Sequence, residues 1–282
     1  MRAPESASHK PPAVELRDIC HRFAQGGRDL PVIEGLNLSV KEGEFLSIVG
    51  PSGCGKSTLL RLISGLSPPT SGAAYVNGEH VDRVRTDVGY MFQTDALLPW
   101  RTVLDNVALP LKLQKVRRQD RERRAREWIA TVGLRGFENS FPHQLSGGMR
   151  KRVSLACTMV ATPNIILMDE PFSALDVQTR SLMENELMAI WQRERKTVLF
   201  VTHDLEEAIA LSDRVVVLSA RPTKVKAVRT IDLARPRNVL DVRSELSFHQ
   251  LYTQLWEDMR EEVLSGYEQE RAAARMQGAD KQ

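Results

Sequence analysis

The chain has 282 residues, enough for one large domain or two small ones at about 100–200 residues each. Its 42% hydrophobic and 27% charged residues are ordinary for a globular protein and exclude a mostly disordered or fibrous chain. No run approaches the roughly 18 consecutive apolar residues of a membrane-spanning helix, and the net charge of only +3 does not by itself indicate nucleic-acid binding.

The N-terminal segment and the cysteines indicate in which compartment the protein is found. Residues 1–13 are rich in Pro, Ser and Ala and lack the apolar core of a signal peptide, so we expect a disordered leader. Cys20, Cys54 and Cys157 are too few and too widely spaced for a disulfide framework or a zinc site. This usage favours a reducing cytosolic environment.

The first third of the chain is predicted to contain β-strands on either side of a glycine-rich turn. Residues 14–23, 36–40 and 44–49 form β-rich runs, and apolar residues at helical spacing predict a helix over 56–66. Asn77-Gly78 predicts a tight hairpin turn, because both positions tolerate positive φ.

The pattern becomes helical from about residue 94 to 161, and Pro99, Pro110 and Pro142 mark breaks within it. This segment therefore predicts a helical insertion. It contains the strongest local charge, because residues 112–126 hold eight Lys/Arg and two Asp/Glu. A solvated helix face is the preferred interpretation, with contact to acidic lipid headgroups as an alternative.

Strand character returns in three short runs, at residues 165–168, 197–201 and 214–218. A helical pattern follows the first run and carries an apolar face. That face comprises Met183, Leu187, Ile190 and Trp191. Strands that alternate with helices indicate βαβ units and a parallel sheet.

The tail predicts one more helix, since apolar residues recur every three to four positions from Phe248 to Val263. Ser247 and Gln250 have the form of a capping box for it. We expect its apolar stripe to face the core, with regulation or dimer contact as the alternatives.

The strongest chemical signal is residues 50–57, which fit the phosphate-binding pattern G-x-x-x-x-G-K-[ST] between a strand and a helix. The glycines let backbone N–H groups converge on phosphate oxygens at a helix N-terminus. Lys56 would reach the β- and γ-phosphates, and Ser57 would bind Mg²⁺. The alternative, a chance glycine-rich turn, does not account for the flanking strand and helix.

A second signal is Asp169-Glu170, where a buried strand ends in two carboxylates at the edge of the sheet that binds ligands. Asp169 can hold Mg²⁺ directly or through water. Glu170 can orient an attacking water or accept its proton. The alternative is an acidic pair that caps a helix.

Ser146-Gly147-Gly148 precedes a predicted helix and is a further candidate anion-binding N-terminus. One chain then has two phosphate-binding elements far apart in sequence, and a sandwich of two chains would use both. By itself this segment is better interpreted as a simple helix cap.

Together these motifs resemble the ATP-binding cassette (ABC) family over about residues 14–219. Residues 145–148 look like the family signature, and residues 173–176 look like its D-loop. Gln93 and His203 fall at the family's Q-loop glutamine and switch histidine, and Phe23 falls where an aromatic ring stacks on adenine.

The resemblance implies an α/β fold: a P-loop NTPase (RecA-like) core with an N-terminal antiparallel β subdomain and an inserted α-helical subdomain. It divides the chain into the leader, an ATPase domain at 14–240 with its helical subdomain at about 94–161, and a C-terminal helix and polar tail at 241–282.

The resemblance also assigns the site, with ATP and Mg²⁺ as cofactors. The catalytic residues would be Glu170, His203, Lys56 and Gln93. The metal ligands would be Ser57, Gln93 and Asp169. The nucleotide-binding residues would be Phe23, Gly50, Pro51, Ser52, Gly53, Cys54, Gly55, Lys56, Ser57, Thr58, Gln93, Ser146, Gly147, Gly148, Asp176 and His203.

A finer resemblance is to the ATPase subunits of importers for nitrate, sulfonates, taurine and related small anions. It is carried by residues 50–55, 98–100, 145–152, 169–172 and 235–237. It implies a homodimer on the cytoplasmic face of the inner cell membrane, peripheral to it. The partners would be membrane permease subunits and, indirectly, an extracytoplasmic substrate-binding protein.

Three positions depart from the family pattern. Met149 replaces the glutamine of the general signature, as is common in the importer subfamily, and Phe23 replaces tyrosine. Cys157 falls where many relatives have arginine, and the sequence offers no physical reason for it.

Two other functions fit parts of the pattern. A soluble ABC-type ATPase acting on DNA would typically carry a long coiled-coil or clamp insertion, which this sequence lacks, and no aromatic platform accompanies the basic run, so we expect no nucleic-acid partner. A stand-alone P-loop kinase would leave Ser146, Gly147 and Gly148 without a role.

Overall fold

The computed structural model describes residues 11–25 and 28–279. Most of the expected disordered leader, residues 1–10, therefore lies outside the described residues. Ala13, the last residue of that predicted leader, is buried, and its carbonyl accepts a hydrogen bond from the backbone N–H of Asn77. The folded chain thus begins slightly before the first strand.

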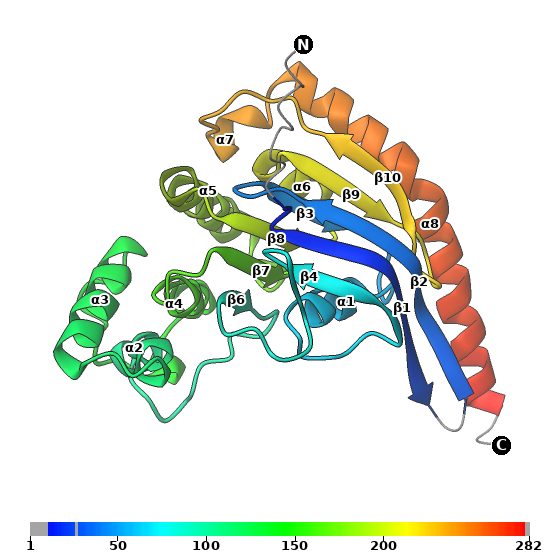
Figure 1. Cartoon of the computed structure of the whole chain (residues 1–282). Helices are drawn as coiled ribbons and strands as arrows, with labels where there is room; N and C mark the ends of the chain where they lie inside the picture. Colours follow the sequence, from blue (N-terminus) through cyan, green and yellow to red (C-terminus); the bar gives the residue numbers. More distant parts are fainter. Residues whose placement is uncertain (1–10, 26–27, 280–282) are drawn as a thin grey trace, which may run out of the picture.

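The centre of the described chain is a sheet with strand order β10-β9-β3-β8-β7-β6 (Figure 1). The strands are β3 (Phe45–Val49), β6 (Val88–Met91), β7 (Ile165–Asp169), β8 (Thr197–Val201), β9 (Arg214–Leu218) and β10 (Val225–Thr230). All neighbours are parallel except β10, which runs antiparallel to β9. The predicted parallel sheet is confirmed.

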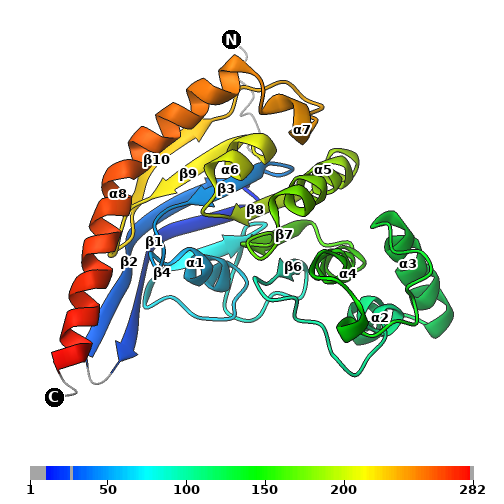
Figure 2. The ribbon, with the colours of Figure 1, turned by 180° about the vertical axis from the view of Figure 1, so that it is seen from behind.

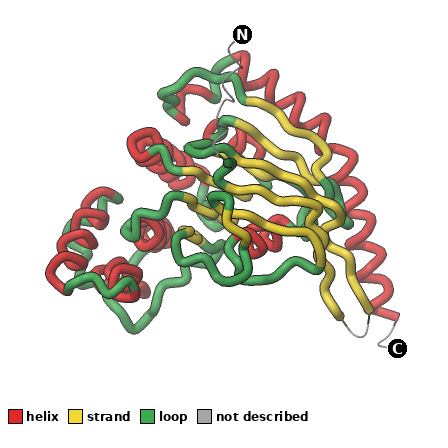
Figure 3. Tube along the Cα trace, viewed as in Figure 1, coloured by secondary structure: helices red, strands yellow, loops and turns green. Residues whose placement is uncertain are grey.

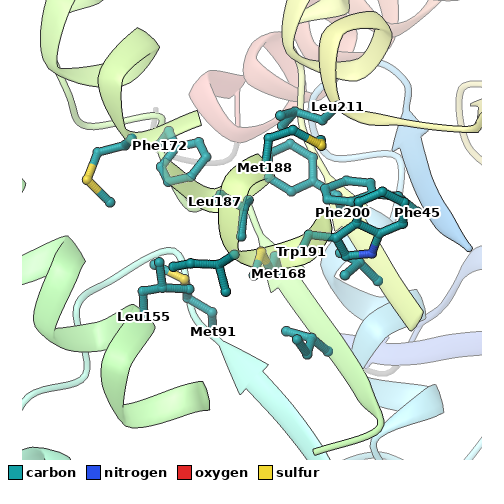
Figure 4. Close-up of a cluster of buried hydrophobic side chains, with 14 of the residues drawn as sticks. Phe45, Met91, Leu155, Met168, Phe172, Leu187, Met188, Trp191, Phe200 and Leu211 are labelled. Carbon is teal, nitrogen blue, oxygen red and sulfur yellow. The ribbon is translucent and has the colours of Figure 1, made fainter. Parts of the chain in front are cut away.

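Both faces of this sheet are buried, because successive side chains point to opposite sides of a strand. In β8, Val198 and Phe200 join the cluster beneath the helices, whereas Leu199 and Val201 join the cluster on the opposite face. Figure 4 shows the first cluster, where the rings of Phe45 and Trp191 meet edge to face at 5.6 Å between centroids. This two-sided burial explains the continuous apolar runs in the sequence.

The second sheet is antiparallel, with strand order β2-β1-β4-β5. Its strands are β1 (Val14–Gln25), β2 (Arg28–Val40), β4 (Ser71–Val76) and β5 (Glu79–His80). The predicted hairpin turn is present, with φ of 51° at Asn77 and 78° at Gly78. Helix α1 (Lys56–Ile63) packs Leu59 and Leu60 into the cluster shared by the two sheets.

The helical insertion forms one end of the molecule, away from the C-terminal helix (Figures 1 and 3). It contains α2 (Val103–Leu113), α3 (Arg118–Thr131), the short 3₁₀ turn Pro142–Gln144 and α4 (Gly147–Met159). Pro110 lies inside α2 and does not end it, because a proline removes one N–H donor and this helix closes within one further turn. In α3, Arg118 pairs with Glu122 at 2.7 Å, as expected for a solvated helix face.

Helix α5 (Val177–Glu194) follows β7 and buries its predicted apolar face. The chain then continues through α6 (Leu205–Leu211), α7 (Val239–Val242) and α8 (Leu246–Ala279). Among the described helices, none is long and apolar enough to cross a bilayer.

The predicted C-terminal helix is present and lies along β10, β9 and α6 (Figure 2). It buries Phe248, Leu255 and Met259, so part of the predicted stripe faces the core, while Trp256 stays 43% exposed. The predicted capping box is wrong: α8 already begins at Leu246, and the hydroxyl of Ser247 donates to the carboxylate of Glu245.

One buried guanidinium ties the segment after β10 to the core. Arg237 is 6% exposed and donates hydrogen bonds to the carbonyls of Ile209, Ser212, Ile231 and Leu233. These carbonyls belong to the end of α6 and to the loop after β10, where no regular ladder would satisfy them.

We therefore predict that Arg237→Met lowers the free energy of unfolding by about 3 kcal/mol, because several buried carbonyls lose their donor at once. Urea unfolding followed by circular dichroism measures this loss. Arg229→Met is the matched control: Arg229 pairs with Asp258 at the surface and should cost less than about 1 kcal/mol. Equal losses in the two variants would contradict the role of Arg237.

Candidate functional site

Four of the predicted site segments meet where parallel strands end. The phosphate loop starts directly after β3, Glu170 follows β7, and Gln93 and His203 stand two residues beyond β6 and β8. These strands are consecutive neighbours in the order β3-β8-β7-β6. Their following loops therefore emerge side by side at one edge, the place where open parallel sheets bind ligands.

The loop before α1 is a cradle for an anion. Gly55 is the N-cap of α1 at φ 114°, no side chain caps this helix start, and its first turn contains no acidic residue. Lys56 is 6% exposed, and its Nζ donates to the carbonyls of Gly50 at 2.9 Å and Pro51 at 3.0 Å. A helix N-terminus with an ammonium held inside the loop is suited to phosphate.

Residues from neighbouring segments pack tightly against this loop. A Cβ on Gly55 would lie 2.8 Å from Cγ1 of Val32, and the hydroxyl of Thr223 donates to the carbonyl of Cys54. The Cys54 side chain is buried, and burial raises the pKa of its thiol, so it stays protonated. Cys54 therefore acts as a buried spacer that contributes backbone to the loop.

The next two site residues join the loop to β7. The hydroxyl of Ser57 donates to Oδ1 of Asp169 at 2.8 Å, and the Tyr90 hydroxyl lies 3.5 Å from Oδ2. Asp169 is 7% exposed, and this burial raises the pKa of its carboxyl. A nearby cation would relieve the cost of burying the carboxylate.

The oxygen donors of Ser57 and Asp169 are the hard ligands that Mg²⁺ prefers, so these residues fit that ion. No group of three or more His, Cys, Asp and Glu side chains that could hold a metal occurs in the described parts of the chain. Mg²⁺ at this position would complete its coordination with water and phosphate oxygens. The amide of Gln93, the third predicted ligand, lies against Glu170.

Glu170 is the centre of a second group. Its Oε2 lies 3.0 Å from Nδ1 of His203 and accepts a hydrogen bond from Nε2 of Gln93 at 3.4 Å. Its backbone has φ 44°, in the left-handed region, and its N–H donates to the carbonyl of Val201. The structure thus brings together Glu170, His203 and Gln93, which come from three different loops.

The remaining predicted residues occupy other surfaces. Ser146 is the N-cap of α4, and its hydroxyl accepts from the N–H of Met149. Asp176 caps α5 by accepting from the N–H of Thr179. These two helix starts adjoin, since a Cβ on Gly148 would lie 2.8 Å from Cγ2 of Thr179.

Phe23 lies on β1, is 42% exposed as a residue, and its ring meets the His21 ring edge to face with 4.8 Å between centroids. Its exposure leaves room for an aromatic ligand to stack. The contact of Phe23 with adenine stays a prediction.

The sequence did not single out Lys151. Its side chain is buried, and its Nζ donates to the carbonyl of Gln93 at 2.6 Å and pairs with Asp95 at 3.2 Å. Lys151 therefore connects α4 to the segment that carries Gln93. As a charge pattern, its basic cluster at 150–152 looks the same as any solvated helix turn.

Comparison with known proteins places this chain in a family. The family described as "ABC transporter" matches residues 33–173. The chain is 38% identical to the aliphatic sulfonates import ATP-binding protein SsuB of Bacillus thuringiensis subsp. konkukian, over 86% of this chain and 94% of that protein. It is 44% identical to the taurine import ATP-binding protein TauB of Rhizobium johnstonii, over 75% of this chain and 81% of that protein.

The nitrate import ATP-binding protein NrtD of Synechocystis is 43% identical, over 78% of this chain and 83% of that protein. Among solved structures, the dimeric post-hydrolysis state of an ATP-binding cassette bound to ADP and Pi matches with a TM-score of 0.70 and 33% identity. That match covers 78% of this chain and 100% of the other.

From the geometry of the loop we predict that Gly55→Ala weakens binding of Mg-ATP at least about tenfold, because the new methyl group would collide with Val32 and strain the backbone at φ 114°. Titration with a fluorescent ATP analogue measures the Kd. Gly136→Ala is the control, since Gly136 has φ 93° with open space around it. Normal nucleotide binding by the Gly55 variant would contradict the proposed cradle.

Proposed function

This chain belongs to the ABC transporter family, and from that membership we propose that it is the ATP-hydrolysing subunit of an importer for a small anion such as nitrate, a sulfonate or taurine. One observation carries the catalytic part of the proposal. The carboxylate of Glu170 is held by His203 and Gln93 at the same sheet edge as the phosphate loop. The substrate class rests on the import proteins that the chain resembles.

The chain's residues would bind ATP from several sides. The amides of 50–58 cradle the phosphates, Lys56 binds the β- and γ-phosphates, and Phe23 stacks on adenine. Ser57 and Asp169 would hold Mg²⁺, with Gln93 reaching it directly or through water. When bound, Mg²⁺ neutralises phosphate charge.

Hydrolysis is an in-line attack of water on the γ-phosphate. Glu170 orients the water and accepts its proton, which its 19% exposed carboxylate can do from the mouth of the site. His203 contacts the γ-phosphate and, together with Gln93, fixes the carboxylate of Glu170. Lys56 and the loop amides stabilise the charge that develops on the phosphate oxygens.

A homodimer would complete the site. In this arrangement Ser146, Gly147 and Gly148 of one protomer bind the ATP held by the phosphate loop of the other, and Asp176 lies at the same interface. Gly147 suits this contact, because almost nothing lies within 4 Å of the place where its Cβ would be. The dimeric solved relative with bound ADP and Pi supports the arrangement.

A groove of about 620 Å³ beside the Gln93 segment is the proposed docking site of a membrane permease. Phe92, Leu97, Leu113 and Cys157 line it, between the central sheet and the helical insertion. Leu113 is 75% exposed, which suits an apolar segment of a partner. The chain would then lie at the cytoplasmic face of the inner membrane, and an extracytoplasmic protein would deliver the anion to the permease.

The alternatives fit less well. An ATPase acting on DNA is not favoured by the named relatives, which are import proteins. A stand-alone kinase leaves the open start of α4 at Gly147 without a function.

We predict that Glu170→Gln binds Mg-ATP but lowers turnover by about a hundredfold or more, because the amide cannot accept the proton of water. Steady-state phosphate release measures turnover, and gel filtration with ATP should show more dimer. Glu206→Gln, which removes an exposed charge on α6, is the control and should change turnover less than about twofold. Unchanged turnover in the Glu170 variant would overturn its assigned role.

We also predict that Leu113→Glu leaves ATP binding intact but lowers cellular uptake of the transported anion at least about tenfold, because a charge in the groove opposes an apolar partner. Uptake of labelled nitrate, taurine and an alkyl sulfonate, in cells lacking the wild-type gene, measures this. Leu182→Glu, at a 52% exposed position on α5, is the control. Equal uptake with both variants would argue against the groove.

A further inference from the structure

Arg180, in the first turns of α5, links two loops of the site. Its NH2 group donates to the carbonyl of Leu175 at 3.2 Å, its NH1 group donates to the carboxylate of Asp204 at 3.2 Å, and its Nε lies 3.7 Å from the carboxylate of Glu207. The side chain is 22% exposed, so these contacts are only partly screened by water.

Asp204 and Glu207, the carboxylates paired with Arg180, build the turn that carries His203. Asp204 caps α6 by accepting from the N–H groups of Glu206 and Glu207. The Glu207 carboxylate accepts a hydrogen bond from the Thr202 hydroxyl at 2.5 Å, and that hydroxyl also accepts from the N–H of Asp204. The residues on both sides of His203, Thr202 and Asp204, are therefore held by hydrogen bonds to the start of α6 and to each other.

The chain of contacts ends at the reacting centre. His203 lies 3.0 Å from Glu170, and its neighbours in sequence, Thr202 and Asp204, are the residues that Arg180 holds directly or through Glu207. At its other end, Arg180 holds Leu175, the residue before Asp176.

We propose that Arg180 is a positioning residue for ATP hydrolysis: it fixes the turn of His203 relative to the turn of Asp176, so that His203 meets Glu170 and the γ-phosphate. This inference rests on the proposed function. It has a consequence for the dimer, because a partner that presses on Asp176 also moves the backbone that Arg180 holds. Closure of the dimer would thus be transmitted to His203.

The competing explanation is that Arg180 only stabilises the packing of α5 against α6 and has no effect on the position of His203. Arg243 provides a matched control for this explanation. It donates to Ser181 at 3.1 Å and Glu184 at 2.7 Å on α5, and it lies 3.6 Å from Glu206 on α6. It thus bridges the same two helices without a direct contact to Leu175, Asp204 or Glu207, and it is linked to the Arg180 cluster through the buried carboxylate of Glu184, which also interacts with Arg180, Asp204 and Glu207.

The first test is steady-state ATP hydrolysis by the purified full-length chain. We expect Arg180→Met to lower kcat about tenfold to a hundredfold with KM for ATP changed less than about twofold, because misplacement of a catalytic group affects the reaction step and not ground-state binding. Arg180→Lys should recover part of the loss. Arg243→Met should keep kcat within about twofold of the wild type.

A double-mutant cycle with His203 identifies the route of the effect. In a His203→Ala background, Arg180→Met should lower kcat by less than about twofold further, because the group it positions is already gone. Full multiplication of the two effects would overturn the proposal. So would an equal loss with Arg243→Met, or a loss in Arg180→Met that appears in KM.

A second measurement does not depend on turnover. The imidazole NMR signal of His203, assigned with His203→Asn, should shift when Glu170 is replaced by Gln, because the two groups are in contact. In the Arg180→Met variant this shift should disappear, and in Arg243→Met it should remain. Retention of the shift in Arg180→Met would overturn the proposal.

The outcomes separate the two levels of inference. Turnover unaffected by Glu170→Gln would refute the proposed function itself. Turnover abolished by Glu170→Gln but unaffected by Arg180→Met would refute only the role of Arg180.

Discussion

The hydrogen bond from the N–H of Glu170 to the carbonyl of Val201 continues the β7–β8 ladder one residue past the strand. It holds Glu170 at φ 44°, a conformation that costs a side-chain-bearing residue about 1–2 kcal/mol. That turn brings the Glu170 carboxylate to His203 and Gln93, which arrive from the loops after β8 and β6. The geometry of the proposed catalytic group therefore depends on the register of a buried parallel ladder.

The other half of the site depends on burial. Ser57 and Asp169 meet across the carboxyl edge, and burial raises the pKa of the Asp169 carboxyl, so a cation bound beside it would stabilise its charge. The loop that presents Ser57 is clamped by Thr223 and by Val32 from the antiparallel sheet. The second sheet thus acts as a support for the phosphate loop, and the proposed adenine contact at Phe23 lies on the same sheet.

The helical insertion is attached by two means. Val107 and Leu155 belong to one hydrophobic cluster with the central sheet, and Lys151 and Asp95 add a buried polar connection to the Gln93 segment. A partner bound in the groove beside this segment would act on Gln93 through its backbone, which Lys151 holds.

The C-terminal helix is attached to the core mainly by apolar contacts. Its ion pairs with β10 are at the surface, and its buried residues Phe248 and Leu255 extend the core.

The sequence predicted the parallel strands well, because a strand buried on both faces is a short apolar run with defined ends, as at 197–201 and 214–218. It did not predict β10, whose alternating exposed residues resemble a polar loop, or the early start of β2 at Arg28. Ser247 misled the placement of the start of the C-terminal helix, which begins at Leu246, because local preference is a weak guide to helix ends.

The sequence by itself determined the chemistry: the phosphate loop, the acidic pair Asp169-Glu170 and their order along the chain, because these patterns act through backbone and residue type at fixed local spacing. Only the tertiary structure decided which side chains meet. Gln93 lies against Glu170 and not against Asp169, Lys151 bonds to the carbonyl of Gln93, and Arg180 bonds to Asp204 beside His203. These are contacts between residues far apart in sequence or between neighbouring loops, and their geometry follows from strand order and helix packing, which no local pattern encodes.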